Sequence, residues 1–152
     1  MINARELFGD IDIYLFDQIL KNQFSDESEI LDAGCGGGRN IVYFLRSGCP
    51  VFAVDENPEA IEHVRNLARS LAPKLPSENF QIAKIEEMPF ADEQFDAVIS
   101  NAVLHFAESQ ELFNRMLQEM WRVLKKDGLP HLRQHYFWFS VSPRRTISLR
   151  TI

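Results

Sequence analysis

The sequence of 152 residues contains only two cysteines, Cys35 and Cys49. Two thiols do not make a disulfide framework, and no Cys and His residues have the clustered spacing of a zinc site. We therefore expect no metal site. We also do not expect either cysteine to act as a nucleophile, because a role as a small packing residue is the simpler explanation at each position.

The sequence also lacks a long apolar run and an excess of basic residues. No segment is apolar enough to span a bilayer, and residues 1–6 lack the apolar core of a signal peptide. The 16 basic and 22 acidic residues give a net charge of −6, which opposes binding to nucleic acid or to an anionic membrane. We expect a cytoplasmic protein with neither partner. The 45% of hydrophobic residues, with 12 Phe among them, suffices for the core of one domain.

The most informative segments are residues 30–40, ILDAGCGGGRN, and residues 51–55, VFAVD. Each begins as a buried strand; the first runs into a glycine turn and the second ends in Asp55. In parallel α/β sheets such glycines let the backbone approach a ligand, and the acid of the second strand accepts hydrogen bonds from ribose hydroxyls. A simpler interpretation is a tight turn with Asp55 capping the next helix. The order of Asp32, glycine turn and Asp55 favours a nucleoside site.

Hydrophobic periodicity predicts the order of the remaining elements. Helices are expected at residues 12–23, 40–47, 58–72 and 110–124, the last two capped by Asn57 and Ser109. The first has Ile13, Phe16, Ile19 and Leu20 on its apolar face; the last has a stripe of Leu, Met and aromatic residues that we expect in the core, and its exit is expected at Gly128. Strands are expected at residues 30–33, 51–55, 80–84 and 95–100. This alternation predicts an α/β fold with a doubly wound, mostly parallel sheet and helices on both faces.

Two ligand classes compete for the predicted site. A dinucleotide would place its pyrophosphate against the glycine turn, where Asp32 would repel it, and Arg39 stands where the third glycine of the dinucleotide fingerprint belongs. The methionine end of S-adenosylmethionine instead carries an ammonium group that Asp32 would attract. At this point the chain resembles the class I S-adenosylmethionine-dependent methyltransferases, whose first motif reads acid-x-Gly-x-Gly-x-Gly.

The resemblance implies a Rossmann-like fold and S-adenosylmethionine as cofactor. The cofactor-binding residues that it implies are Asp32, Gly34, Cys35, Gly36, Gly38, Asp55, Glu56, Ile85, Glu86 and Asn101. The stretch IEEMPFADEQFDAVIS at residues 85–100 is similar to the segment before the fourth strand in small-molecule methyltransferases. Lys84 departs from the pattern, because the family usually has an acid there to hold adenine. Glu86 would then substitute, although a solvated charged turn explains Glu86 and Glu87 equally well.

Asn101 and the residues after it resemble the segment that lies beside the transferred methyl group in this family. His105 is the one catalytic residue that we predict, as a general base for a hydroxyl or amine acceptor. A structural histidine is the competing interpretation, because methyl transfer to a well-aligned acceptor needs little more than proximity.

The resemblance covers about residues 8–128 and then ends. Residues 129–152 contain four of the 16 basic residues and none of the 22 acidic ones. We therefore expect a methyltransferase-like domain at 1–128 and an atypical segment at 129–152 that lacks the last strands of a seven-stranded sheet. One hypothesis is a shifted reading frame; the rivals are a natural short variant and a basic tail. Residues 131–141 would form a substitute strand, and the exposed sheet edge would favour a homodimer.

The sequence thus predicts methyl transfer from S-adenosylmethionine to a small molecule that it does not identify. A different class of function is a catalytically impaired nucleoside-binding or interaction module. An NAD-dependent oxidoreductase is a further alternative, and Asp32 and Arg39 argue against it.

Overall fold

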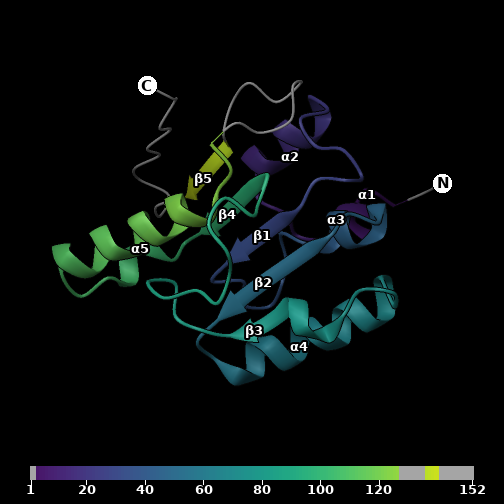
Figure 1. Cartoon of the computed structure of the whole chain (residues 1–152). Coiled ribbons are helices and arrows are strands. Elements are labelled where there is room, and N and C mark those ends of the chain that lie inside the picture. Colours follow the sequence, from purple (N-terminus) through teal and green to yellow (C-terminus); the bar gives the residue numbers. More distant parts are fainter. Residues whose placement is uncertain (1–2, 127–135, 141–152) are drawn as a thin grey trace.

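The computed structural model describes residues 3–126 and the backbone of residues 136–140. Five strands form one sheet in the order β3-β2-β1-β4-β5, and all neighbouring strands are parallel (Figure 1). They are β1 (Ile30–Ala33), β2 (Val51–Asp55), β3 (Phe80–Ile82), β4 (Ala97–Asn101) and β5 (Tyr136–Ser140). This sheet confirms the predicted α/β class.

Two helices precede β1, and the others follow β1, β2 and β4. The helices are α1 (Ala4–Phe8), α2 (Ile13–Leu20), α3 (Val42–Ser47), α4 (Pro58–Leu71) and α5 (Gln110–Val123), with short 3-10 turns at Ser77–Asn79 and Leu104–Phe106. The two predicted caps are confirmed: the Asn57 side chain accepts from the Glu59 N–H, and the Ser109 hydroxyl accepts from the Leu112 N–H. In the part of the chain that the structure describes, no helix is both long and apolar enough to cross a membrane.

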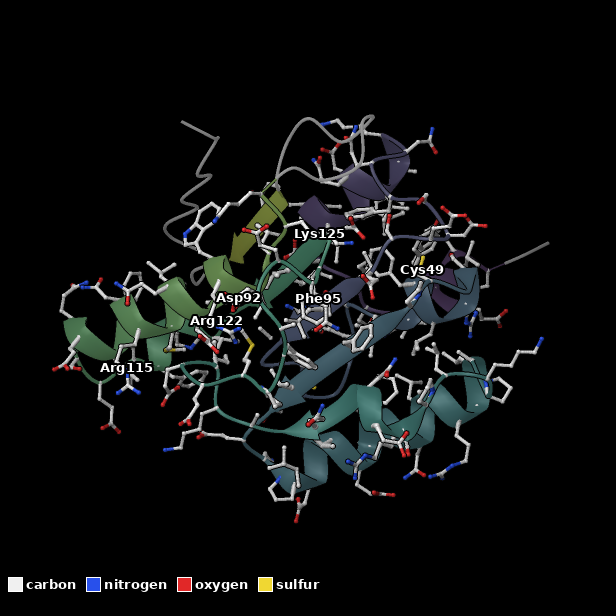
Figure 2. All side chains as sticks on the ribbon, viewed as in Figure 1. Cys49, Asp92, Phe95, Arg115, Arg122 and Lys125 are labelled. Carbon is white, nitrogen blue, oxygen red and sulfur yellow. The ribbon has the colours of Figure 1, made fainter. Side chains whose placement is uncertain are left out.

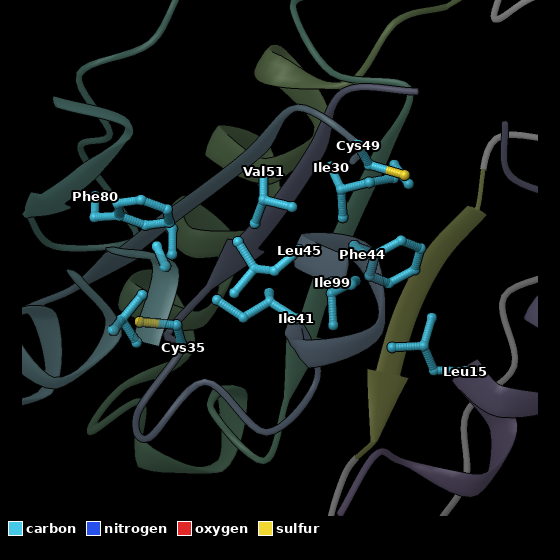
Figure 3. Packing of buried hydrophobic residues seen from close by; sticks show 14 of the residues in the cluster. Leu15, Ile30, Cys35, Ile41, Phe44, Leu45, Cys49, Val51, Phe80 and Ile99 are labelled. Atoms are coloured by element: carbon cyan, nitrogen blue, oxygen red, sulfur yellow. The ribbon is translucent and has the colours of Figure 1, made fainter. Parts of the chain in front are cut away.

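Two hydrophobic clusters cover the two faces of the sheet. Helices α2, α3 and α4 pack on one face of the sheet. There, Phe44 and Leu45 of α3 and its N-cap residue Ile41 lie in one cluster with the strand residues Ile30, Val51 and Ile99 (Figure 3). Helix α5 covers the other face through Met116, Met120 and Val123. Alternate residues of β1, β2 and β4 enter the two clusters, so the helices lie on both faces as predicted.

Some boundaries differ from the predictions. Helix α2 is shorter than residues 12–23, and Ile13 and Leu20 are 68% and 62% exposed, whereas the buried positions are Leu15 and Ile19. The choice of apolar face was therefore wrong at Ile13 and Leu20. Helix α1 was not predicted. Strand β4 begins at Ala97 rather than at residue 95, because Phe95 pairs with Leu124 after α5 instead of continuing the ladder to β1.

Strand β5 falls within the predicted substitute strand at residues 131–141 and pairs with β4 along its whole length, from Ala97↔Tyr136 to Asn101↔Ser140. The predicted helix exit at Gly128 lies outside the described residues, and so does most of the segment 129–152. The division into two parts at residue 128 stays a prediction.

Candidate nucleoside site

A pocket of about 880 Å³ opens at the carboxyl ends of the strands. The chain order reverses between β1 and β4, so the loops that leave these strands diverge and form a crevice, the usual ligand position in open α/β sheets. Eight of the predicted site residues line the pocket: Gly34, Cys35, Gly36, Asp55, Glu56, Ile85, Glu86 and Asn101.

The glycine turn forms the pocket wall above β1. Its start is fastened to β2, because the N–H groups of Gly34 and Cys35 both donate to the carbonyl of Val54, at 2.8 and 3.0 Å. Gly34 has φ +81°, and a Cβ there would lie 2.5 Å from Val103 Cγ2. Gly36 has φ +48°, and a Cβ there would meet no atom within 4 Å. Gly34 is thus required for packing, whereas Gly36 exposes bare backbone to the open pocket.

Asp55 ties the end of β2 to two neighbouring loops. Its Oδ2 accepts from the Gly36 N–H at 2.9 Å, and its Oδ1 accepts from the Asn57 N–H at 2.9 Å. A carboxylate has about four acceptor positions, so both oxygens retain capacity for ligand hydroxyls. The simpler interpretation, that Asp55 caps α4, does not hold, because Asn57 occupies the cap.

Asp32 lies behind the glycine turn and is 1% exposed. Its Oδ2 has no hydrogen-bond partner among the described residues. Burial raises the pKa of Asp32 to about 7; Arg39 opposes this shift and Asp55 adds to it. Asn101 lies two residues beyond Ile99, the β4 partner of Asp32, and its buried Nδ2 also lacks a partner in the described part of the chain.

An acceptor and a donor are therefore left without partners at the ends of adjacent strands, on the same face of the sheet. Unpaired buried polar groups are costly, which makes them candidates for ligand contacts. The Asp32 carboxylate, when ionised, would attract a cationic ligand group through the glycine turn, and Asn101 Nδ2 at the pocket wall could donate to an anionic group; an amino acid carries both groups. Cys35 is not suited to act as a nucleophile, because burial and the nearby Asp32 raise the pKa of its thiol far above its usual range.

The loop after β3 supplies the opposite wall. Ile85 is buried, Glu86 is half-buried, and Lys84 is exposed at the pocket margin. Both residues predicted to hold a base therefore line the pocket. Lys84 lines it as well, and its ammonium is a donor where the family usually has an acceptor.

Three predicted residues do not line the pocket: Asp32, Gly38 and His105. Asp32 is covered by the glycine turn, and Gly38 packs against Val64 and Leu67 of α4. His105 is exposed, and its ring contacts Phe106 with 4.0 Å between centroids. The general-base role of His105 stays a prediction.

Sequence reasoning missed most of the far end of the pocket. Phe106 and Glu108 come from the loop after β4, and Leu112 and Met116 come from α5. The periodicity of α5 predicted that its Leu and Met residues are core; Met116 is both core and pocket wall. Asn40 was also missed, although it is 3% exposed and its Oδ1 accepts from the Asp12 N–H at 3.0 Å. A polar residue directly after the glycine turn was the available signal.

Comparisons with known proteins agree with this geometry. Residues 31–131 match a family model described as a methyltransferase domain. An uncharacterized methyltransferase of Bacillus subtilis, YodH, is 35% identical over 105 residues, which cover 69% of this chain and 42% of YodH. A malonyl-[acyl-carrier protein] O-methyltransferase of Enterobacter lignolyticus is 34% identical over 116 residues, which cover 70% of this chain and 43% of that protein. The chain thus spans less than half the length of these two relatives.

Solved structures show the same fold. A S-adenosylmethionine-dependent methyltransferase from Methanosarcina mazei superposes with a TM-score of 0.60 at 31% identity, over 70% of this chain and 52% of that one. The PH0226 protein of Pyrococcus horikoshii superposes with a TM-score of 0.62 at 26% identity, over 76% of this chain and 50% of that one. The five-stranded parallel arrangement is therefore part of a larger known architecture.

Proposed function

Because this chain belongs to the class I S-adenosylmethionine-dependent methyltransferase family, we propose that it binds S-adenosylmethionine in the pocket at the ends of β1, β2 and β4 and transfers its methyl group to a small molecule. The observation that carries this proposal is the buried Asp32 Oδ2 without a partner behind an open glycine turn, together with Asn101 Nδ2, also without a partner, at the pocket wall. A zwitterionic amino-acid end fits that pair, and a pyrophosphate does not.

The remaining residues fit the rest of the cofactor. Asp55 has free acceptor capacity for ribose hydroxyls, and Glu56 lies beside it at the pocket wall. Ile85 and Glu86 would flank the base, with the Glu86 carboxylate available to accept from an amino group. Gly34, Cys35, Gly36 and Gly38 would shape the turn that covers the methionine end.

The chemistry asks little of the protein beyond alignment. S-adenosylmethionine supplies a methyl group on a positively charged sulfur, which an acceptor displaces in line. The pocket residues would hold the reacting atoms at the required distance and exclude water, which accounts for most of the acceleration. Phe106, Leu112 and Met116 offer an apolar wall for an acceptor at the far end. We propose His105 only as a proton acceptor at the margin.

The wider setting of the protein is also a proposal. The net charge of −6 supports a small-molecule acceptor rather than a nucleic acid. Two buried free thiols suit a reducing compartment such as the cytoplasm. Within the described part of the chain, strand β5 ends the sheet order, so its outer edge supports pairing of two copies.

Isothermal titration with S-adenosylhomocysteine tests the proposal. We expect saturable one-to-one binding that weakens at least tenfold in Asp55→Asn, since that change removes one charged acceptor. His105→Gln is the matched control and should bind like the parent chain, because His105 lies outside the pocket wall. Tighter binding of NADH than of S-adenosylhomocysteine would contradict the proposal, and so would no binding by a folded chain.

A further inference from the structure

The segment between β3 and β4 carries one wall of the pocket but belongs to neither strand. Within it, the Glu87 N–H donates to the Lys84 carbonyl at 3.2 Å and closes a turn that presents Ile85 and Glu86 to the pocket. Residues 83–94 form no helix or strand of their own. Something outside the segment must therefore hold this wall in position.

Two side chains of α5 hold it from behind. The N–H of Met88 donates to Glu119 Oε1 at 2.8 Å, and the carbonyl of Met88 accepts from Arg122 Nη2 at 3.1 Å. Arg122 Nη1 also donates to the carbonyl of Phe90 at 2.8 Å and to Asp92 Oδ1 at 2.7 Å. Figure 2 shows Arg122 and Asp92 together beside α5, with Arg115 farther out along the same helix.

Glu119 and Arg122 also fix each other. The guanidinium donates from Nε to Glu119 Oε2 at 2.9 Å and from Nη2 to Glu119 Oε1 at 2.7 Å, a two-point contact with defined geometry. The hydrogen bond from Arg122 holds the pKa of Glu119 below its usual range, so the carboxylate stays ionised near neutral pH. Side-chain exposures of 31% for Arg122 and 15% for Glu119 limit the competition from water.

These side-chain hydrogen bonds take the place of the backbone hydrogen bonds that a neighbouring strand would make to the loop. One preassembled ion pair binds both backbone groups of Met88, two residues after Glu86, and the Met88 carbonyl also accepts from the Phe90 N–H at 2.9 Å. Neither Glu119 nor Arg122 lines the pocket, so any influence on a ligand must pass through the loop. A rigid wall loses less conformational entropy on binding than a mobile one.

We propose that Arg122, with Glu119, is a positioning residue that holds the 84–92 loop in its ligand-binding position. The proposal rests on the proposed function for the identity of the ligand, S-adenosylmethionine. The predicted rigidity of the loop in the ligand-free chain does not depend on the proposed function. Lysine has a single point of contact in place of the guanidinium fork, so Arg122→Lys keeps the charge and loses the geometry.

The experiment compares Arg122→Lys with Arg115→Lys, an exposed position on the same helix. Hydrogen–deuterium exchange of the ligand-free chains should be roughly tenfold faster in peptides covering residues 84–92 of Arg122→Lys only, because one charge-assisted contact is lost. Affinity for S-adenosylhomocysteine should fall by roughly the same factor. Arg115→Lys should match the parent chain in both measurements. Faster exchange over the whole chain, or unchanged affinity with a loosened loop, would overturn the proposal.

A charge-swapped double variant, E119R with R122E, separates loop positioning from simple helix stabilisation. The swap restores the ion pair on α5 but places a carboxylate near the carbonyls of Met88 and Phe90. We expect exchange of residues 84–92 to stay fast; recovery of parent exchange and affinity would overturn the proposal. A parent chain that does not bind S-adenosylhomocysteine contradicts the proposed function alone, and the exchange comparison still decides whether Arg122 holds the loop.

Discussion

Asp32 connects the ligand site to the stability of the protein. Its pKa is raised from 3.8 to about 7 by burial, so between about pH 4 and 7 the folded chain holds a proton that the unfolded chain has released. The free energy of unfolding should therefore fall as pH rises through this window, by up to about 1.4 kcal/mol per pH unit. Above the window both states are ionised and the contribution no longer changes.

Urea denaturation at pH 5 and pH 7 measures this slope. Asp32→Asn cannot ionise, so it should gain stability relative to the parent as pH rises from 5 to 7. Glu119, whose pKa is lowered, contributes a slope of opposite sign that is common to both chains and cancels in the comparison. Parallel pH dependences of parent and variant would show that Asp32 does not carry the proton.

Gly34 and Gly36 give a matched pair of alanine substitutions. Gly34→Ala should lose about 2–4 kcal/mol of stability, because φ is +81° and the new Cβ would lie 2.5 Å from Val103. Gly36→Ala, with φ +48° and no atom near the new Cβ, should lose only about 1–2 kcal/mol. It should nevertheless weaken S-adenosylhomocysteine binding about tenfold, since the methyl group enters the pocket. Chemical denaturation and calorimetry check both; equal stability losses would refute the distinction.

At the scale of elements, hydrophobic periodicity predicted correctly those boundaries that depend only on the residues of the element itself. The α4 boundaries followed from Asn57, Pro58 and the amphipathic pattern, and they were confirmed. The predicted apolar face of α2 was right at Ile19 but wrong at Ile13 and Leu20, because two faces of this short helix are apolar and only packing against α3 and the sheet selects Leu15 over Ile13. The start of β4 was missed for a similar reason: Phe95 pairs with Leu124, a contact distant in sequence.

A second ionic contact lies at the end of the sheet opposite the pocket, where it joins the residues before β1 and β4 to the residue after the C-cap of α5. Lys125 Nζ lies 3.0 Å from Asp96 Oδ2 and 3.2 Å from Glu29 Oε2, and the same Asp96 oxygen accepts from the Glu29 N–H at 2.9 Å. Because the Asp96 side chain is only 4% exposed, removal of its cation leaves a buried carboxylate poorly compensated.

Lys125→Met should therefore destabilise the chain by about 1–3 kcal/mol. Lys126→Met is the control, since Lys126 is 80% exposed where it pairs with Glu93 and surface pairs contribute little. Thermal unfolding at low and high salt measures both variants. Equal shifts in melting temperature for the two variants would mean that the burial of Asp96 does not increase the contribution of its ion pair to stability.

At the scale of the whole molecule, the structure brings together at one pocket the predicted residues that follow the ends of parallel strands. Asp55 and the glycine turn meet because parallel strands end at one edge of the sheet. The part of the far wall formed by Leu112 and Met116 could not be read from the sequence, because it depends on how α5 crosses the sheet. The hydrogen bond from Arg122 to the Met88 carbonyl also joins residues distant in sequence, and no local sequence pattern predicts it.

Among the residues that the structure describes, β5 is the last strand on its side of the sheet, and this edge is the subject of the last prediction. One side of β5 bonds to β4, and consecutive residues of a strand direct their N–H groups to opposite sides. Proline removes one N–H. Of Phe137→Pro and Trp138→Pro, one should therefore break the ladder to β4 and lower the melting temperature, and the other should remove a donor only from the outer edge.

If two copies pair through that edge, sedimentation velocity should show a concentration-dependent dimer for the parent chain. The variant that keeps its melting temperature should be monomeric, because its outer edge can no longer complete the pairing. Lys126→Met, away from β5 in sequence, should dimerise like the parent. A monomeric parent at all concentrations would refute edge pairing, and a dimer that survives both proline substitutions would place the contact on another surface.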